Sequence, residues 1–122
     1  MRERIILPGY VAYDDLPSIY SAATALVYPS LYEGFGLPPL EAMACCCPVV
    51  LSDNSSLREV AEGAALYIDN PQRCEDVAGS ILEIVNDERL RQSLRSRGYE
   101  QARRFSWERT LDKTISAYNS IL

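Results

Sequence analysis

The stretch of residues 29–44 reads PSLYEGFGLPPLEAMA and decides how the chain is organised. The apolar run before it, at residues 24–28, is typical of a strand, and the spacing of Leu40 and Met43 after it is typical of a helix. A loop with two glycines lies between them. In open parallel α/β sheets, ligands bind beyond the carboxyl ends of the strands. We therefore expect a ligand site at this loop.

The same alternation of apolar runs and helical spacing continues on both sides of the loop. Three more runs predict strands, at residues 4–7, 48–52 and 64–68. A helix capped by Asp14 or Asp15 is expected before the second strand, and only helices follow the fourth, the last of them capped by Ser106. The sequence predicts an α/β fold in one domain, residues 1–122, with a partial parallel sheet of about four strands flanked by helices and a C-terminal run of helices.

The two glycines of the loop, Gly34 and Gly36, allow left-handed backbone conformations and a close approach to a ligand. The amides of Phe35, Gly36 and Leu37 would then point outward at the start of a helix, where the helix dipole favours an anion such as a phosphate. Two prolines follow directly and have no N–H group, so the donors are concentrated at these three residues.

Two carboxylates frame these amides. Glu41 lies one helical turn after the loop, where it could accept hydrogen bonds from the vicinal diol of a ribose; Glu33 precedes the glycines and would lie nearer the reacting part of a ligand. Each glutamate also has a purely structural interpretation, Glu41 as an acid stabilised by the helix dipole and Glu33 as an exposed loop residue.

Cysteine and histidine content limits the chemistry. The chain has no histidine, which excludes Ser-His and Cys-His catalysis and every histidine-containing metal site. Cys45, Cys46, Cys47 and Cys74 lack the C-x-x-C spacing of a zinc or redox site, so we expect reduced and mostly buried cysteines. No metal site is predicted.

The charge pattern argues against a nucleic-acid partner, since 12 basic and 17 acidic residues give a net charge of −5. Residues 89–122 are nevertheless basic, with 8 basic and 3 acidic side chains. This segment could contact anionic lipid, but its arginines are scattered around the helices, which favours a solvated surface. With no apolar run near the roughly 18 residues of a membrane helix and no secretory signal, a cytoplasmic protein is expected.

The string E-G-F-G-L-P-x-L-E-A-M-A, at residues 33–44, contains an E-x7-E pattern between a predicted strand and a predicted helix. With this string the chain resembles glycosyltransferase family 4, whose members are retaining enzymes with the GT-B fold. Matching segments extend along nearly the whole chain, at residues 7–11, 16–23, 28–30, 48–50, 59–61 and 105–107. The resemblance implies a Rossmann-like sheet.

The resemblance also implies roles for the loop residues. In such enzymes the glutamate that matches Glu41 binds the ribose hydroxyls, and the one that matches Glu33 lies close to the transferred sugar and is implicated in catalysis. The backbone that matches Phe35, Gly36 and Leu37 meets sugar hydroxyls and the diphosphate.

The segment that matches Tyr10 and Val11 lines the nucleobase, largely through main-chain atoms. Enzymes of this family transfer a sugar from a nucleotide-diphosphate donor with retention of configuration, and they require neither a metal nor a cofactor. The implied partner of this chain is therefore a nucleotide sugar.

The resemblance covers only the later part of the C-terminal, donor-binding domain. The N-terminal acceptor-binding domain, two strands of the sheet and the Arg/Lys pair that neutralises the diphosphate have no counterpart in the sequence. We therefore expect a partial domain with little or no transferase activity alone, whose exposed sheet edges promote self-association. The alternative is a non-catalytic module that binds a nucleotide sugar or another protein.

Two positions depart from the family pattern. Cys46 stands where the family usually has glycine, at the end of the motif helix, and would cost about 1 kcal/mol if that position is left-handed. Arg58 stands where proline is common. Neither position belongs to the implied ligand pattern.

Overall fold

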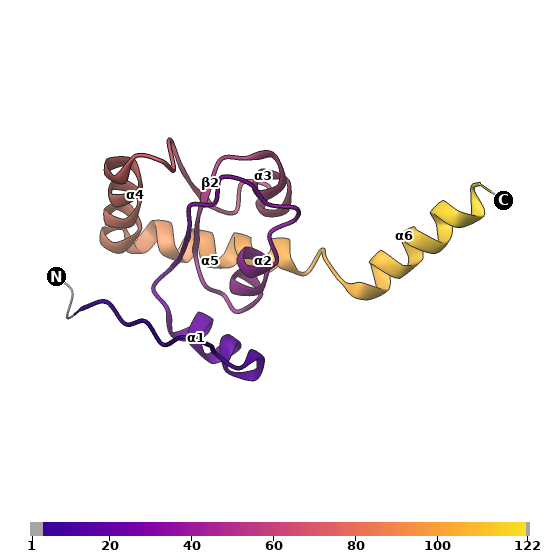
Figure 1. Ribbon diagram of the computed structural model, residues 1–122, viewed down its shortest axis with the longest axis horizontal. Helices are drawn as coiled ribbons and strands as arrows, with labels where there is room; N and C mark the ends of the chain where they lie inside the picture. Colours follow the sequence, from indigo (N-terminus) through magenta and orange to yellow (C-terminus); the bar gives the residue numbers. More distant parts are fainter. Residues whose placement is uncertain (1–3, 122) are drawn as a thin grey trace.

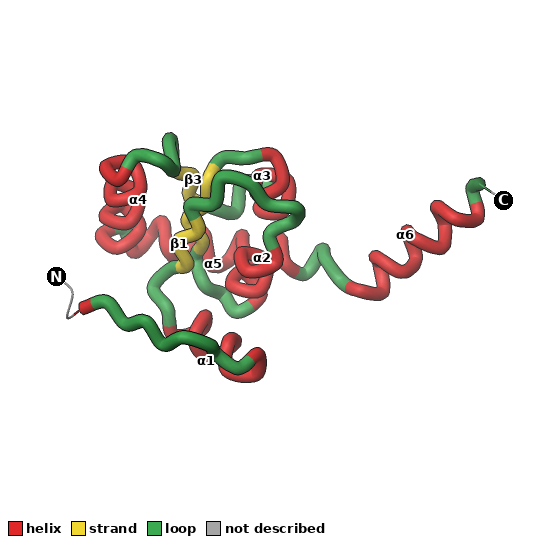
Figure 2. Tube along the Cα trace, viewed as in Figure 1, coloured by secondary structure: helices red, strands yellow, loops and turns green. Residues whose placement is uncertain are grey.

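The computed structural model describes residues 4–121, which contain a parallel sheet of three short strands, drawn in yellow in Figure 2. In spatial order these strands are β1 (Leu26–Tyr28), β2 (Val49–Ser52) and β3 (Leu66–Ile68). Val27 of β1 lies opposite Val50 of β2. The α/β fold is confirmed, together with the predicted strands at residues 24–28, 48–52 and 64–68, each of them shorter than expected.

The expected strand at residues 4–7 is not formed, so the sheet has three strands and not four. Residues 5–12 have no regular structure and lead through a 3-10 turn into α1 (Leu16–Ala22). Ile6 and Leu7 are 84% and 88% exposed. An apolar run is a stable strand only where a neighbouring strand supplies backbone hydrogen bonds, and no strand of the described residues pairs with this one.

Both faces of the sheet are covered, which explains why all four residues of β2 are buried. Val49 and Leu51 pack in one core cluster with residues of α2 (Leu37–Ala44) and α3 (Ser55–Ala61). Val50 packs in a second cluster with residues of α4 (Cys74–Asn86) and α5 (Glu88–Ala102). The strand alternation thus assigns α2 and α3 to one face and α4 with the start of α5 to the other.

The later part of α5 crosses to α2. A Cβ atom at Gly98 would lie 3.0 Å from Cγ of Met43, so the absence of a side chain at residue 98 allows the two helices to approach closely. Ala102, near the end of α5, belongs to the same core cluster as Met43. This contact fixes the position of α2, which contains the predicted site residue Glu41.

The last helix, α6 (Trp107–Asn119), projects away from the rest of the molecule (Figure 1). Its predicted cap is confirmed, because the side chain of Ser106 accepts a hydrogen bond from the amide of Arg109. The apolar side expected for this helix is largely exposed, with Trp107 at 80% and Tyr118 at 67%.

The expected cap of α1 is wrong. A 3-10 turn (Tyr13–Asp15) runs directly into α1, and neither Asp14 nor Asp15 accepts a capping hydrogen bond. The reason is the backbone of Asp15, which is already helical at φ −87° and ψ −19°, whereas a capping residue needs an extended conformation.

Cys46, at the end of α2, is left-handed, with φ +56°, so the condition for the cost expected there is met. The amide of Cys47 donates to the carbonyl of Ala42 and that of Cys46 to the carbonyl of Met43, which is a Schellman motif. The expectation of mostly buried cysteines is wrong, because only Cys47 of the four is buried. Cys46 is exposed at the left-handed position of this motif, and the next residue, Cys47, is buried.

No helix among residues 4–121 is both long enough and apolar enough to cross a membrane.

Candidate functional site

The loop between β1 and α2 is shaped by Gly36, which precedes α2 with φ +107° and ψ 50°. Gly36 is buried against α3, and a Cβ atom added to it would lie only 2.7 Å from Cδ2 of Leu57. The left-handed conformation expected at Gly36 is thus confirmed. At Gly34 it is wrong, since this glycine has no positive φ and open space around it.

The start of α3 holds the loop from the other side. Asn54 donates from Nδ2 to the carbonyl of Ser30 at 3.0 Å, and Ser56 donates from Oγ to the carbonyl of Glu33 at 2.8 Å. Asn54 also caps α3 by accepting from the amide of Leu57. Neither residue was predicted for the site; the polar residues 53–56 before Leu57 are typical of a turn and a helix start, and they give no sign of a contact with the loop.

Glu33 accepts two hydrogen bonds on the same carboxylate oxygen. The hydroxyl of Tyr28, at the end of β1, lies 2.6 Å from Oε1, and the hydroxyl of Ser30 lies 2.8 Å from it. These bonds, that of Tyr28 first, lower the pKa of Glu33 below its ordinary value. The same carboxylate raises the pKa of Tyr28 to about 12. Glu33 is therefore ionised and Tyr28 protonated at neutral pH.

Glu41 has a weaker tyrosine partner. It is half-buried in α2, and its Oε2 lies 3.5 Å from the hydroxyl of Tyr20 in α1. Burial, followed by the charge of Glu41, raises the pKa of Tyr20 above its ordinary value. The tyrosine thus remains a hydrogen-bond donor to this carboxylate.

The two tyrosines relate the two carboxylates to each other. Tyr20 and Tyr28 both pack against the core cluster that contains residues of α2 and α3. Glu33 and Glu41 therefore belong to the same side of the sheet. Neither tyrosine could be assigned to the site from spacing, since the contacts join residues five and 21 positions apart.

The three predicted amides lie between these carboxylates in the sequence. The N–H groups of Phe35, Gly36 and Leu37 donate to none of the described residues. The side chains of Phe35 and Leu37 are 44% and 49% exposed, and the Phe35 ring also meets that of Phe105 edge to face. Free donors at the start of a helix can bind an anion, and the flanking carboxylates can accept hydrogen bonds from hydroxyls.

Tyr10 and Val11 lie in the irregular segment before α1. Tyr10 is 92% exposed and Val11 is half-buried. The loop before α2 contacts the start of α3 through Asn54 and Ser56. No hydrogen bond or aromatic contact among the described residues joins Tyr10 or Val11 to this loop, and their place at the nucleobase stays a prediction.

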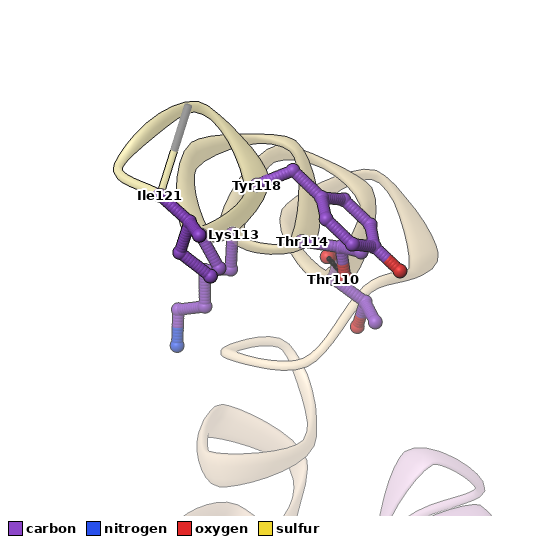
Figure 3. Close-up of a pocket in the computed structure, with 6 residues that line it drawn as sticks. Thr110, Lys113, Thr114, Tyr118 and Ile121 are labelled. Carbon is purple, nitrogen blue, oxygen red and sulfur yellow. Dashed lines mark hydrogen bonds between the residues drawn. The ribbon is translucent and has the colours of Figure 1, made fainter.

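A hollow elsewhere in the molecule has a different character. Figure 3 shows it on α6, where its lining comes from Thr110, Lys113, Thr114, Ala117, Tyr118 and Ile121. All of these residues belong to one projecting helix or its end, so the hollow is an open surface and contains none of the predicted site residues.

The proteins similar to this chain include mannosyltransferases of Escherichia coli. The chain is 48% identical over 110 residues to the O-antigen chain mannosyltransferase B of Escherichia coli, covering 90% of this chain and 29% of that protein. It is 35% identical to the serotype-specific mannosyltransferase WbdA of Escherichia coli, covering 99% of this chain and 15% of that protein. The chain thus spans less than a third of the length of these relatives.

The solved structure of a sucrose-phosphate synthase from Thermosynechococcus elongatus has the same fold over 98% of this chain, with a TM-score of 0.87 and 32% identity. The aligned part is 30% of the synthase chain. Residues 1–101 also match the sequence family described as "Glycosyl transferases group 1". With most of its length matched, and with its α/β fold shared by the synthase, the chain belongs to the group 1 glycosyl transferases.

Proposed function

We propose that this chain forms the donor side of the active site of a retaining glycosyltransferase of family 4 and binds a nucleotide-diphosphate sugar. One observation carries the proposal: the amides at the start of α2, which donate to none of the described residues, are flanked in the sequence by two carboxylates, and each carboxylate accepts a hydrogen bond from a tyrosine that packs against the same core cluster. This combination suits a ligand with both anionic phosphates and hydroxyl groups.

Each residue has a role in the proposed complex. The amides of Phe35, Gly36 and Leu37 bind the diphosphate, and Glu41 accepts hydrogen bonds from the ribose hydroxyls. Glu33 lies at the transferred sugar and acts as the catalytic carboxylate. As the bond to the leaving diphosphate breaks, negative charge grows at the amides, and an ionised Glu33 stabilises the positive charge that develops on the sugar. Neither role requires a metal ion or a cofactor.

Tyr10 and Val11 are proposed to line the nucleobase through main-chain atoms. Tyr10 is 92% exposed and Val11 is half-buried, so main-chain atoms of this segment are open to a ligand.

The rest of the catalytic machinery is proposed to lie outside these 122 residues, in an acceptor-binding domain and in the first part of the donor-binding domain, which would supply the Arg/Lys pair. No basic side chain is present in residues 29–44, so only amides would neutralise the diphosphate. Missing charge stabilisation of this kind costs several kcal/mol in the transition state, and we expect little or no turnover by the isolated chain. Turnover of a nucleotide sugar by the isolated chain would contradict this expectation.

Isothermal titration calorimetry of the chain tests donor binding. The probes are GDP-mannose, UDP-glucose and ADP-glucose; a mannose donor is included because two relatives are named mannosyltransferases. Glu41→Ala is expected to weaken binding at least tenfold, since a carboxylate bonded to a diol is lost. Glu83→Ala, at an exposed glutamate of α4, is the matched control and should bind as the wild type does.

The result also decides between the proposal and its alternative. Binding that is lost in Glu41→Ala and kept in the control supports the donor site. No binding of any of the three probes, or equal binding by both variants, would favour a non-catalytic interaction module.

A further inference from the structure

The hydrogen bonds to Glu33 are unequal between its two oxygens. Oε1 accepts from both Tyr28 and Ser30, whereas Oε2 accepts from none of the described side chains. A carboxylate held at one oxygen by two donors has its plane fixed, and its other oxygen remains available to a ligand.

The hydroxyl of Ser30 has two possible acceptors for its single proton. Ser30 Oγ lies 2.8 Å from Glu33 Oε1 and 3.1 Å from the carbonyl of Tyr32, but a hydroxyl has one proton to donate. The carboxylate is the stronger acceptor and the closer one, so it takes this proton. Oε1 therefore keeps both donors.

Tyr28 is rigidly placed for this contact. Its backbone pairs with β2 opposite Leu51, and its ring packs against the core cluster that contains Leu51 and Leu57. On the other side, Ser56 fixes the carbonyl of Glu33 from α3. The carboxylate and the main chain of Glu33 are thus both tied to the folded core.

We propose that Tyr28 is a positioning residue, whose hydroxyl fixes the carboxylate of Glu33 so that Oε2 accepts a hydrogen bond from the sugar of the donor, with Ser30 as the second support. This inference rests on the proposed function, because it takes Glu33 to face the sugar and not the nucleotide. Tyr28 itself transfers no proton and forms no bond to the ligand.

The ionisation of the pair agrees with this role. The hydrogen bond from Tyr28 lowers the pKa of Glu33, and it raises the pKa of Tyr28 to about 12. The proton therefore stays on the tyrosine over the physiological range, and Glu33 stays an acceptor.

The test combines two measurements on Tyr28→Phe, which keeps the ring in the core and removes only the hydroxyl. The first is a pH titration of the Glu33 carboxyl carbon by NMR, assigned with Glu33→Gln; the pKa of Glu33 is expected to rise. The second compares calorimetric titrations with GDP-mannose and GDP, or with the sugar nucleotide found to bind and its diphosphate. Binding of the sugar nucleotide is expected to weaken about tenfold, while binding of the diphosphate stays unchanged.

Three further variants distinguish the loss of a hydrogen bond to Glu33 from a general disturbance of the loop. Tyr32→Phe removes the hydroxyl of an 87% exposed tyrosine in the same loop and should change neither measurement. Ser30→Ala should act in the same direction as Tyr28→Phe, and Ser30→Thr, which keeps a hydroxyl, should restore both values. The serine variants also test the proposal if Tyr28→Phe fails to fold.

The outcomes are distinct. An unchanged Glu33 titration in Tyr28→Phe and Ser30→Ala, or equal weakening of sugar nucleotide and diphosphate, would overturn this inference alone. If the wild type binds none of GDP-mannose, UDP-glucose and ADP-glucose, the proposed function and this inference fail together.

Discussion

Replacing Gly36 by alanine places a methyl group where the fold has no room for it. The added Cβ would lie 2.7 Å from Cδ2 of Leu57, which is fully buried and cannot move into solvent. A residue with a side chain at φ +107° also pays a backbone penalty of about 1–2 kcal/mol. Overpacking in a core adds about 1–3 kcal/mol. Gly36→Ala is therefore expected to lower the free energy of unfolding by about 2–5 kcal/mol.

Urea denaturation followed by circular dichroism measures this loss. The matched control is Gly34→Ala, two residues earlier in the same loop, where a Cβ atom meets nothing within 4 Å and φ is not positive. It should leave stability unchanged or raise it by up to about 1 kcal/mol, because alanine restricts the unfolded chain.

A double mutant separates overlap from strain. Leu57→Val removes the δ carbons that the added methyl group would overlap. In this background Gly36→Ala should still cause the backbone penalty, but its total cost in unfolding free energy should be smaller by at least about 1 kcal/mol. If Gly36→Ala costs no more than Gly34→Ala, the buried, left-handed geometry at residue 36 is refuted.

Three other predictions concern residues outside the loop between β1 and α2. Cys46→Gly should stabilise the chain by about 1 kcal/mol in urea, since residue 46 is left-handed, whereas Cys46→Ala should give no such gain. The hydrogen bond from Arg58 lowers the pKa of Asp53. The stabilisation by this pair is therefore complete above the ordinary pKa of an aspartate and disappears as pH falls through the pKa of Asp53 in the folded protein. The difference in urea midpoint between the wild type and Arg58→Ala should shrink from pH 6 to pH 2. Self-association in sedimentation velocity is expected to increase with concentration, because exposed apolar side chains such as that of Ile6 promote contacts between chains. Ile6→Lys should reduce it, and a wild-type monomer at every concentration would contradict this prediction.

The predictable part of the site follows from local chemistry. A strand, two glycines and a helix start are all visible in the sequence of residues 24–44, because apolar spacing, glycine and proline act on the backbone over a few residues. Glu33, the amides of residues 35–37 and Glu41 could therefore be selected without coordinates. The left-handed position at Cys46 was suggested only by the glycine that the resembled family usually has there.

Long-range contacts account for what the sequence analysis missed. Asn54 and Ser56 reach the loop from residues more than 20 positions away, and Tyr20 reaches Glu41 across 21 positions. Such hydrogen bonds depend on how α1 and α3 pack against the sheet, and spacing along the chain contains no information about that packing. The same holds for Gly34 and Gly36, which look alike in the sequence; only Gly36 has a positive φ, and only at Gly36 would an added Cβ atom meet Leu57.

The sequence by itself determined the α/β class, the order of strands and helices after residue 15, and the residues that frame the loop, because these depend on backbone preferences of neighbouring residues. Tertiary structure alone decided that residues 5–7 remain unpaired, that one oxygen of Glu33 is held by Tyr28 and Ser30, and that α6 stands apart from the core. The physical reason is that burial and hydrogen bonding require a partner in space, whereas an apolar or polar pattern shows only that a residue is suited to one.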